Sequence, residues 1–242
     1  MKEGKTRRRA VTRTVVVGGV LISAAAIALI TPWLGVFGLR QISVSGNRRV
    51  SAEAIGRTAG LDRDQSLLTV SLSAVSTRVA TLPWIKQVSV TRKLPHTLCI
   101  RVVERAPVAW IRLPDDSGCL TIGEGGVLVA SNCDSRDATF QLLGAALSGD
   151  ALGSRLVDER VADLIDVLHA APPPSVNIER IDVSDPSSIV LDEASGLRIL
   201  LGSIDLFARR VEALAAMSRS IDVGKYALID LRLEGEARLV TW

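Results

Sequence analysis

Aromatic side chains, histidines and cysteines are scarce in this chain of 242 residues, and each shortage excludes a class of function. Four Trp, three Phe and one Tyr are too few to build the stacking platforms on which proteins bind single-stranded nucleic acid. Two histidines and three cysteines, without a Cys-x-x-Cys pair, are a poor source of metal ligands. We therefore expect no metal site.

The body of the chain carries almost no net charge. The overall charge of +3 comes from the first 13 residues, which hold six basic residues and one acidic residue. The rest of the chain holds 23 basic and 25 acidic residues. A nearly neutral body lacks the basic face that binding to phosphate backbones requires. We therefore expect no nucleic-acid partner.

Catalytic motifs are missing as well. The sequence contains no Gly-x-Ser-x-Gly, Ser-x-x-Lys, His-Glu-x-x-His or phosphate-binding loop. His96 falls in a predicted hairpin and His169 near a predicted helix C-terminus, where a cationic side chain is favourable without any catalytic role. We therefore interpret the chain as a protein that is not an enzyme, with no catalytic residue and no small-molecule substrate.

A long apolar run follows the basic tail. Thr14 to Leu39 is 26 residues without a charge, and Pro32 is expected to end its helix. As one helix the run would measure about 39 Å, more than the hydrocarbon core of about 30 Å. We predict a basic cytoplasmic tail over residues 1–13 and a transmembrane helix over residues 14–34.

The basic residues before the apolar run predict its orientation, and its length bears on whether it is cleaved. By the positive-inside rule, the bases before the span keep the N-terminus in the cytoplasm and place the long remainder outside. The alternative is a signal peptide cleaved near Ala24-Ala25-Ala26. Apolar residues continue well beyond that point, which favours an uncleaved anchor. We therefore predict a single-pass protein of the cell membrane.

The three cysteines leave at least one thiol without an intramolecular partner. Cys99 lies in an alternating, strand-like segment, whereas Cys119 and Cys133 flank a predicted hairpin with a glycine turn at Gly123-Glu124-Gly125-Gly126. A disulfide between Cys119 and Cys133 is compatible with an extracytoplasmic location. Two reduced cysteines are the alternative, and the sequence leaves both open.

The segment after the span alternates between strand and helix patterns. Ser51 is a predicted N-cap and Gly60 a predicted helix end, while Pro83 stops a second amphipathic helix. The order of predicted elements is strand, helix, helix, strand, strand, over the ranges 41–45, 51–60, 71–82, 85–91 and 97–104. The α+β class follows from this order.

This order resembles a POTRA domain, and its details resemble the FtsQ/DivIB family of cell-division proteins. The resemblance is carried by short motifs in a shared order behind one membrane span: Val44-Ser45-Gly46-Asn47, Ala59-Gly60-Leu61, Leu82-Pro83-Trp84-Ile85, Val88-x-Val90-x-Arg92, and Leu98-x-Ile100-x-Val102-x-Glu104-Arg105-x-Pro107-Val108-Ala109. It implies a POTRA domain over residues 35–107 and a mostly β domain over residues 108–242. In the β domain we predict short strands, a helix capped by Ser154, and a late helix after Asp205.

The resemblance also implies a function, and it implies no cofactor. Such a protein is a divisome scaffold at the division septum that connects partners of the FtsB/FtsL type to the septal peptidoglycan synthesis machinery. The alternative is a membrane-anchored, extracytoplasmic POTRA-type module for assembly or ligand binding.

The last strand is the predicted partner site. From Tyr226 onward the side chains alternate, and a terminal strand often lies at a sheet edge, where unpaired N–H and C=O groups can accept another strand. In the resembling family FtsB is understood to bind by strand addition near this position. An ordinary covered strand is the alternative. The predicted partner-binding residues share one face of this strand: Tyr226, Leu228, Asp230, Arg232 and Glu234.

Overall fold

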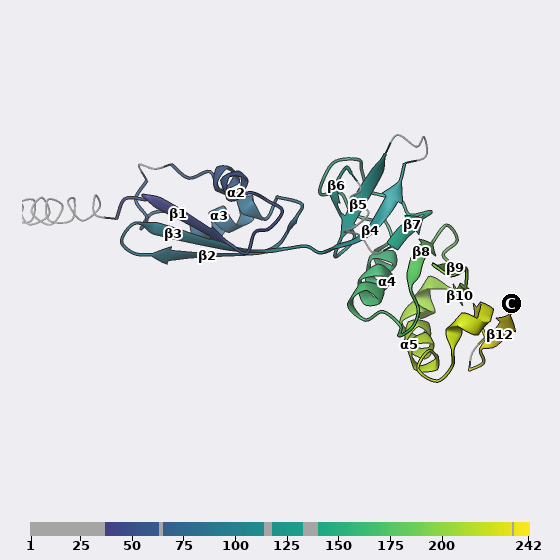
Figure 1. The fold of residues 1–242 in the computed structure, drawn as a ribbon. Coiled ribbons are helices and arrows are strands. Elements are labelled where there is room, and N and C mark those ends of the chain that lie inside the picture. Colours follow the sequence, from purple (N-terminus) through teal and green to yellow (C-terminus); the bar gives the residue numbers. More distant parts are fainter. Residues whose placement is uncertain (1–36, 63–64, 114–117, 133–139, 234) are drawn as a thin grey trace, which may run out of the picture. The chain divides into compact units, whose positions relative to one another are not determined.

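A computed structural model describes residues 37–62, 65–113, 118–132, 140–233 and 235–242 (Figure 1). The chain divides into two compact units, of which the first contains residues up to Ala80 together with Gln87–Val103. The second contains Thr81–Lys86 and Glu104–Trp242, so a short segment of the predicted POTRA domain belongs to the second unit. Within the described ranges, none of the helices has the length and apolar character needed to cross a bilayer. The predicted span over residues 14–34 lies outside the described residues.

The first unit has the predicted mixed order of strands and helices. It is built from β1 (Gln41–Ser45), α2 (Ala52–Ala59), α3 (Leu72–Val79), β2 (Ile85–Lys93) and β3 (Thr97–Glu104). Its sheet has the order β1-β3-β2, with β1 parallel to β3. The order confirms the α+β class predicted for this region.

Local signals define both helices of the first unit. The Ser51 side chain accepts a hydrogen bond from the Ala54 N–H at the start of α2, and Gly60 ends that helix in the left-handed conformation. Ser71 caps α3 in the same way as Ser51 caps α2. Both helices then bury their apolar side chains, which are Ile55, Ala59, Val75 and Val79.

Gly46 supplies a turn that other residues cannot make. Its φ is +87°, and a Cβ at this position would lie 2.1 Å from the Val102 carbonyl oxygen. We expect Gly46→Ala to lower the free energy of unfolding by about 2–4 kcal/mol, because it adds left-handed strain to a backbone clash. Gly56→Ala is the matched control, since a Cβ there meets nothing within 4 Å and helix α2 gains up to about 1 kcal/mol. Denaturant unfolding of both variants measures the difference, and equal effects would contradict it.

The second unit contains one sheet of nine strands. Its order is β12-β11-β10-β9-β8-β7-β4-β5-β6, with β7 parallel to both its neighbours and β10 parallel to β11. The strands are β4 (Pro107–Arg112), β5 (Cys119–Gly123), β6 (Val127–Ala130), β7 (Phe140–Leu143), β8 (Ile178–Asp182), β9 (Ile189–Glu193), β10 (Arg198–Gly202), β11 (Tyr226–Asp230) and β12 (Arg238–Thr241).

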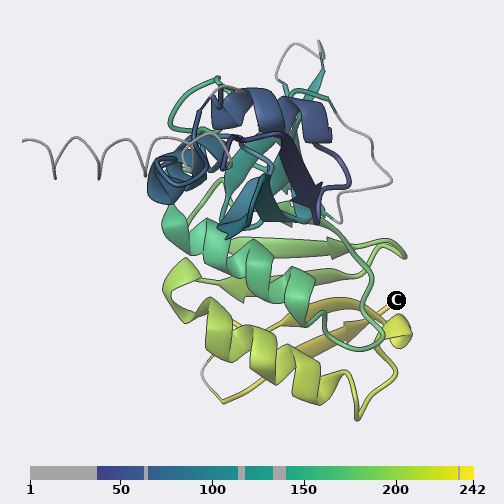
Figure 2. The same cartoon turned by 90° about the vertical axis from the view of Figure 1, so that its left-hand side faces the viewer.

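Helices α4 (Glu159–Ala170) and α5 (Phe207–Met217) lie side by side across one face of this sheet (Figure 2). Two 3-10 turns, Ile204–Leu206 and Val223–Lys225, precede α5 and β11. Ser154 is the predicted cap of α4, but the residue that caps the helix is Asp158, whose carboxylate accepts the Arg160 N–H. Residues 153–156, which precede Asp158, instead form backbone hydrogen bonds with strand β6 and the glycine before it.

The two faces of the sheet differ in chemistry. The face under the helices forms the core, with Ile181, Leu191, Ile199 and Ile229 fully buried in register across four strands. Their neighbours in sequence project to the other face, where Asp192 on β9 pairs with Arg198 at 3.0 Å and with Arg180 at 3.5 Å. Each pair is partly exposed and contributes little to stability, so burial on the helix side holds the sheet together.

Candidate functional site

One edge of the nine-stranded sheet is covered by the chain itself. Strand β6 forms that edge, and residues 153–156 run along it. The Leu128 N–H donates to the Ser154 carbonyl at 2.8 Å, and the Gly153 N–H donates to the Leu128 carbonyl at 2.8 Å. A third bond, 2.9 Å long, runs from the Leu156 N–H to the Gly126 carbonyl. Backbone groups on this side are therefore already paired.

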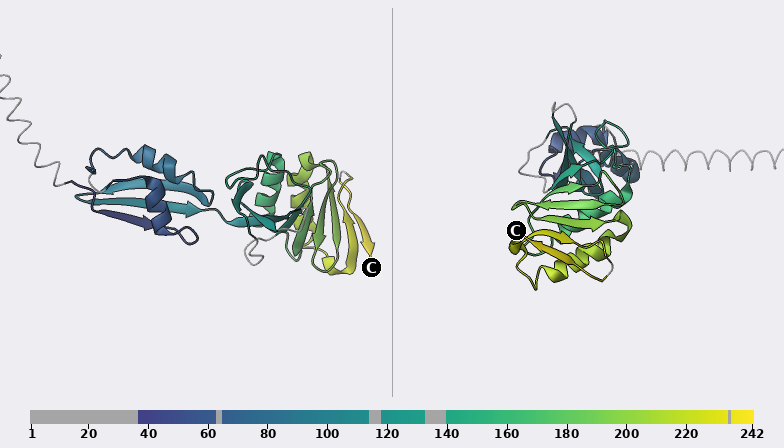
Figure 3. Two further views of the ribbon diagram at one scale, coloured as in Figure 1. Left: turned by 90° about the horizontal axis from the view of Figure 1, so that it is seen from above. Right: turned by 90° about the vertical axis from the view of Figure 1, so that its right-hand side faces the viewer.

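The opposite edge is β12. Among the residues described, this strand pairs with β11 alone, in antiparallel register, and no backbone bond reaches its outer side. Figure 3 shows β12 as the outermost strand, next to the C-terminus. An open edge of this kind presents unpaired N–H and C=O groups to another chain.

Three of the predicted partner residues, Tyr226, Leu228 and Asp230, lie one strand further in, whereas Arg232 follows that strand. Tyr226–Asp230 forms β11, which is hydrogen-bonded to β10 on one side and to β12 on the other. The expectation that this segment is the final, edge-forming strand is therefore wrong. Asp230 is also not on an exposed face, because it is only 8% accessible. The position of these residues in the sheet does not test whether they bind a partner, so their role in partner binding stays a prediction.

A local hydrogen bond explains why the strand stops early. The Asp230 carboxylate accepts the Arg232 N–H at 3.0 Å, which turns the chain out of the strand two residues later. Gly235, with a φ of +77°, belongs to the connection that brings the chain back as β12. Glu234, the last of the predicted site residues, lies outside the described residues.

Apolar side chains surround the open edge. Leu228 and Val240 are register partners on the face of the sheet away from the helices, and Val240 is 41% exposed. Leu233 and Trp242 are more exposed still, at 59% and 68%. The Trp242 indole N–H donates to the Gly224 carbonyl at 3.2 Å, and the ring lies close to Gly196, so it extends from the end of β12 over the segments that precede β11 and β10. Exposed aromatic and aliphatic groups next to an open strand are typical of a protein-binding surface.

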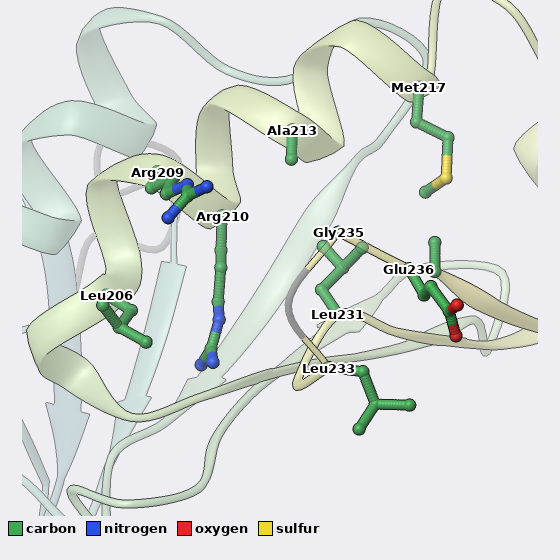
Figure 4. Close-up of a pocket in the computed structure, with 10 residues that line it drawn as sticks. Leu206, Arg209, Arg210, Ala213, Met217, Leu231, Leu233, Gly235 and Glu236 are labelled. Atoms are coloured by element: carbon green, nitrogen blue, oxygen red, sulfur yellow. The ribbon is translucent and has the colours of Figure 1, made fainter.

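A groove adjoins the edge on the helix side (Figure 4). It has a volume of about 250 Å³ and lies between α5 and the connection from β11 to β12. Its walls combine apolar side chains with two arginines and one glutamate: Leu206, Arg209, Arg210, Ala213, Met217, Leu231, Leu233, Gly235, Glu236 and Ala237.

Low pH is expected to destabilise the second unit near the C-terminal end of β11. Hydrogen bonds from Arg232 hold the pKa of Asp230 below its ordinary value, so the ionised carboxylate stabilises the fold. This contribution is present above the ordinary pKa of about 3.9 and is lost as pH falls through the lowered pKa of the folded chain. Asp230→Asn should cost about 1–3 kcal/mol at neutral pH and flatten the acid dependence of the unfolding temperature between about pH 4 and pH 2. An equally steep acid dependence in the variant would contradict this assignment.

The cysteines are only partly defined by the structure. Cys119, at the start of β5, is disulfide-bonded, and Cys99 in β3 is a free, half-buried thiol. Cys133, the partner predicted for Cys119, lies outside the described residues. The pairing of Cys119 with Cys133 therefore remains a prediction.

Comparison with known proteins gives the class of the first unit. Residues 37–105 match the family model described as "POTRA domain, FtsQ-type". The first unit therefore carries a POTRA domain of the FtsQ type, in agreement with its observed strand and helix order.

The chain also resembles whole cell-division proteins in sequence. It is 36% identical over 135 residues to the cell division protein FtsQ of Geobacter sp. (strain M21), covering 54% of this chain and 48% of that protein. It is 36% identical over 137 residues to FtsQ of Novosphingobium aromaticivorans, covering 56% of this chain and 39% of the relative. The cell division protein DivIB of Clostridium acetobutylicum is 24% identical over 205 residues, with 82% and 81% covered. The matches to the two FtsQ proteins thus span about half of their length or less, and the predicted resemblance to the FtsQ/DivIB family is confirmed.

Proposed function

We propose that this protein is a bitopic cell-division scaffold, anchored by residues 14–34 with both folded units outside the cytoplasm. At the division septum it binds division proteins of the FtsB/FtsL type and links them to septal peptidoglycan synthesis. The FtsQ-type POTRA domain and the similarity to cell division proteins FtsQ and DivIB support the division role. The observation that carries the binding role is the open edge at β12.

Strand addition is the binding mode that this edge supports. A partner segment in extended conformation would pair with the outer N–H and C=O groups of β12 and become the tenth strand of the sheet. Its side chains would alternate between the two faces, next to Val240 on one and Leu239 on the other. The half-buried Leu239 packs against the core cluster, so an apolar partner side chain there would extend the core.

Co-purification tests the proposal directly. The full chain, expressed in a dividing bacterium, should be recovered with an FtsB/FtsL-type pair and should concentrate at the septum. Septal localisation also separates this proposal from a POTRA-type assembly or ligand-binding module, which would be distributed over the envelope. A chain that is correctly inserted, evenly distributed and recovered without the pair would exclude the scaffold role.

A further inference from the structure

We infer that Arg210, Asp230 and Arg232 form a positioning network that holds strand β12 in place for partner binding. The inference extends the proposed function, because it concerns how the open edge is kept ready to accept a strand. It rests on side chains that converge from α5 and from the chain leaving β11, next to the end of β10.

Asp230 and Arg232 form the first half of the network. The Arg232 guanidinium donates two bonds to the Asp230 carboxylate, from Nε at 2.9 Å and from Nη2 at 2.7 Å. Together with the bond from the Arg232 backbone N–H, three donors from one residue bind one carboxylate. Such two-point pairing fixes orientation as well as distance, so the direction in which the chain leaves β11 is defined.

Arg210 forms the second half. Its Nη1 donates to the Leu201 carbonyl near the end of β10, and its Nη2 donates to the Arg232 carbonyl at 3.1 Å. Figure 4 shows this side chain extended from α5. One planar guanidinium thereby joins the helix, the neighbouring strand and the start of the connection to β12. A lysine ammonium is a compact point charge and cannot reproduce this fork.

Gly202 provides independent support for the network. Its φ is +74°, and a Cβ there would lie 2.6 Å from Arg210 Nη1 and 2.9 Å from Arg232 Cγ. The end of β10 therefore has no side chain at the one point where the two arginines approach it. A larger residue would push both arginines away from the positions that make their hydrogen bonds.

Strand β12 needs such support because its own pairing is weak. It has four residues and, in the described part of the chain, one neighbouring strand. A short strand held on one side belongs to the least stable part of a sheet. The network fixes the segment that leads into β12, so the strand stays ordered without a partner and binds one without first having to order.

Amide hydrogen exchange on the full chain tests this inference without a partner. In Arg210→Gln and in Arg210→Lys, protection of the β12 amides should fall about tenfold, while that of the Ile199 and Ile229 amides in β10 and β11 should change less than about twofold. Arg219→Gln is the matched control, because it removes an exposed charge just beyond α5. Unchanged protection in β12, or an equal loss in all three strands, would overturn the inference.

Binding provides the second readout. Affinity for an FtsB-type partner should fall about tenfold in Arg210→Gln and stay unchanged in Arg219→Gln. A full-affinity Arg210→Gln chain would overturn the role in binding. If the unmodified chain binds no strand at β12, the proposed function fails, whereas the exchange measurement still decides whether the network positions the strand.

Discussion

A chain that ends at Gly235 is expected to lose partner binding, by about a hundredfold or more, while the second unit stays folded. The missing residues form β12 and its flanks, which carry the outer backbone groups of the sheet. Strand addition draws its affinity from these main-chain groups, so removing the strand removes the interaction as a whole. Affinity for an FtsB/FtsL-type pair, measured with purified full-length and truncated chains, gives the size of the effect.

Two controls keep this result interpretable. Val240→Thr retains the backbone and a β-branched side chain at the edge, so its affinity should stay within about threefold of the unmodified chain. Thermal unfolding of the truncated chain shows whether the remaining eight strands are intact, since Ile229 in β11 loses its neighbour Leu239. A folded truncated chain that still binds at full affinity would place the partner site elsewhere.

Loss of a core side chain on α4 is expected to have the largest effect on stability. Leu164 is fully buried in the cluster between helix and sheet, so Leu164→Ala should lower the free energy of unfolding by about 3–5 kcal/mol. Val167 on the same helix is 38% exposed, and Val167→Ala should cost less than about 1 kcal/mol. Denaturant unfolding monitored by tryptophan fluorescence compares the two. Similar losses would mean that α4 does not pack on the sheet through Leu164.

The sequence predicts the first unit well because its signals are local. Ser51 caps α2 and Gly60 ends it, so hydrophobic periodicity and local capping signals agree for that helix. Helix α3 begins after Ser71 as predicted but ends at Val79, three residues before the predicted end at Leu82. The second unit depends on pairings between distant segments. Strand β7 (Phe140–Leu143) is only four residues long and lies between β4 and β8, an order that no periodicity reveals.

The alternation of apolar side chains does not predict the edge strand β12. Leu231 and Leu233 continue the alternation of β11, so the sequence suggests one strand through Glu234. The strand ends at Asp230 because its carboxylate binds the Arg232 N–H, a contact two residues apart that leaves the alternation unchanged. Gly235, between two apolar runs, is the signal that could have predicted the additional strand β12.

The covered edge at β6 has a consequence for assembly. Because residues 153–156 cover β6 while the outer side of β12 is open, this sheet has one edge that can pair with another strand and one edge that cannot. Copies of this unit therefore cannot stack head to tail into a filament through their sheets, which would need two complementary ends. Two copies could pair through their sheets only β12 to β12, and that closed pair would occupy the edge proposed to bind the partner strand. Self-association through this sheet and recruitment of a partner would then exclude each other.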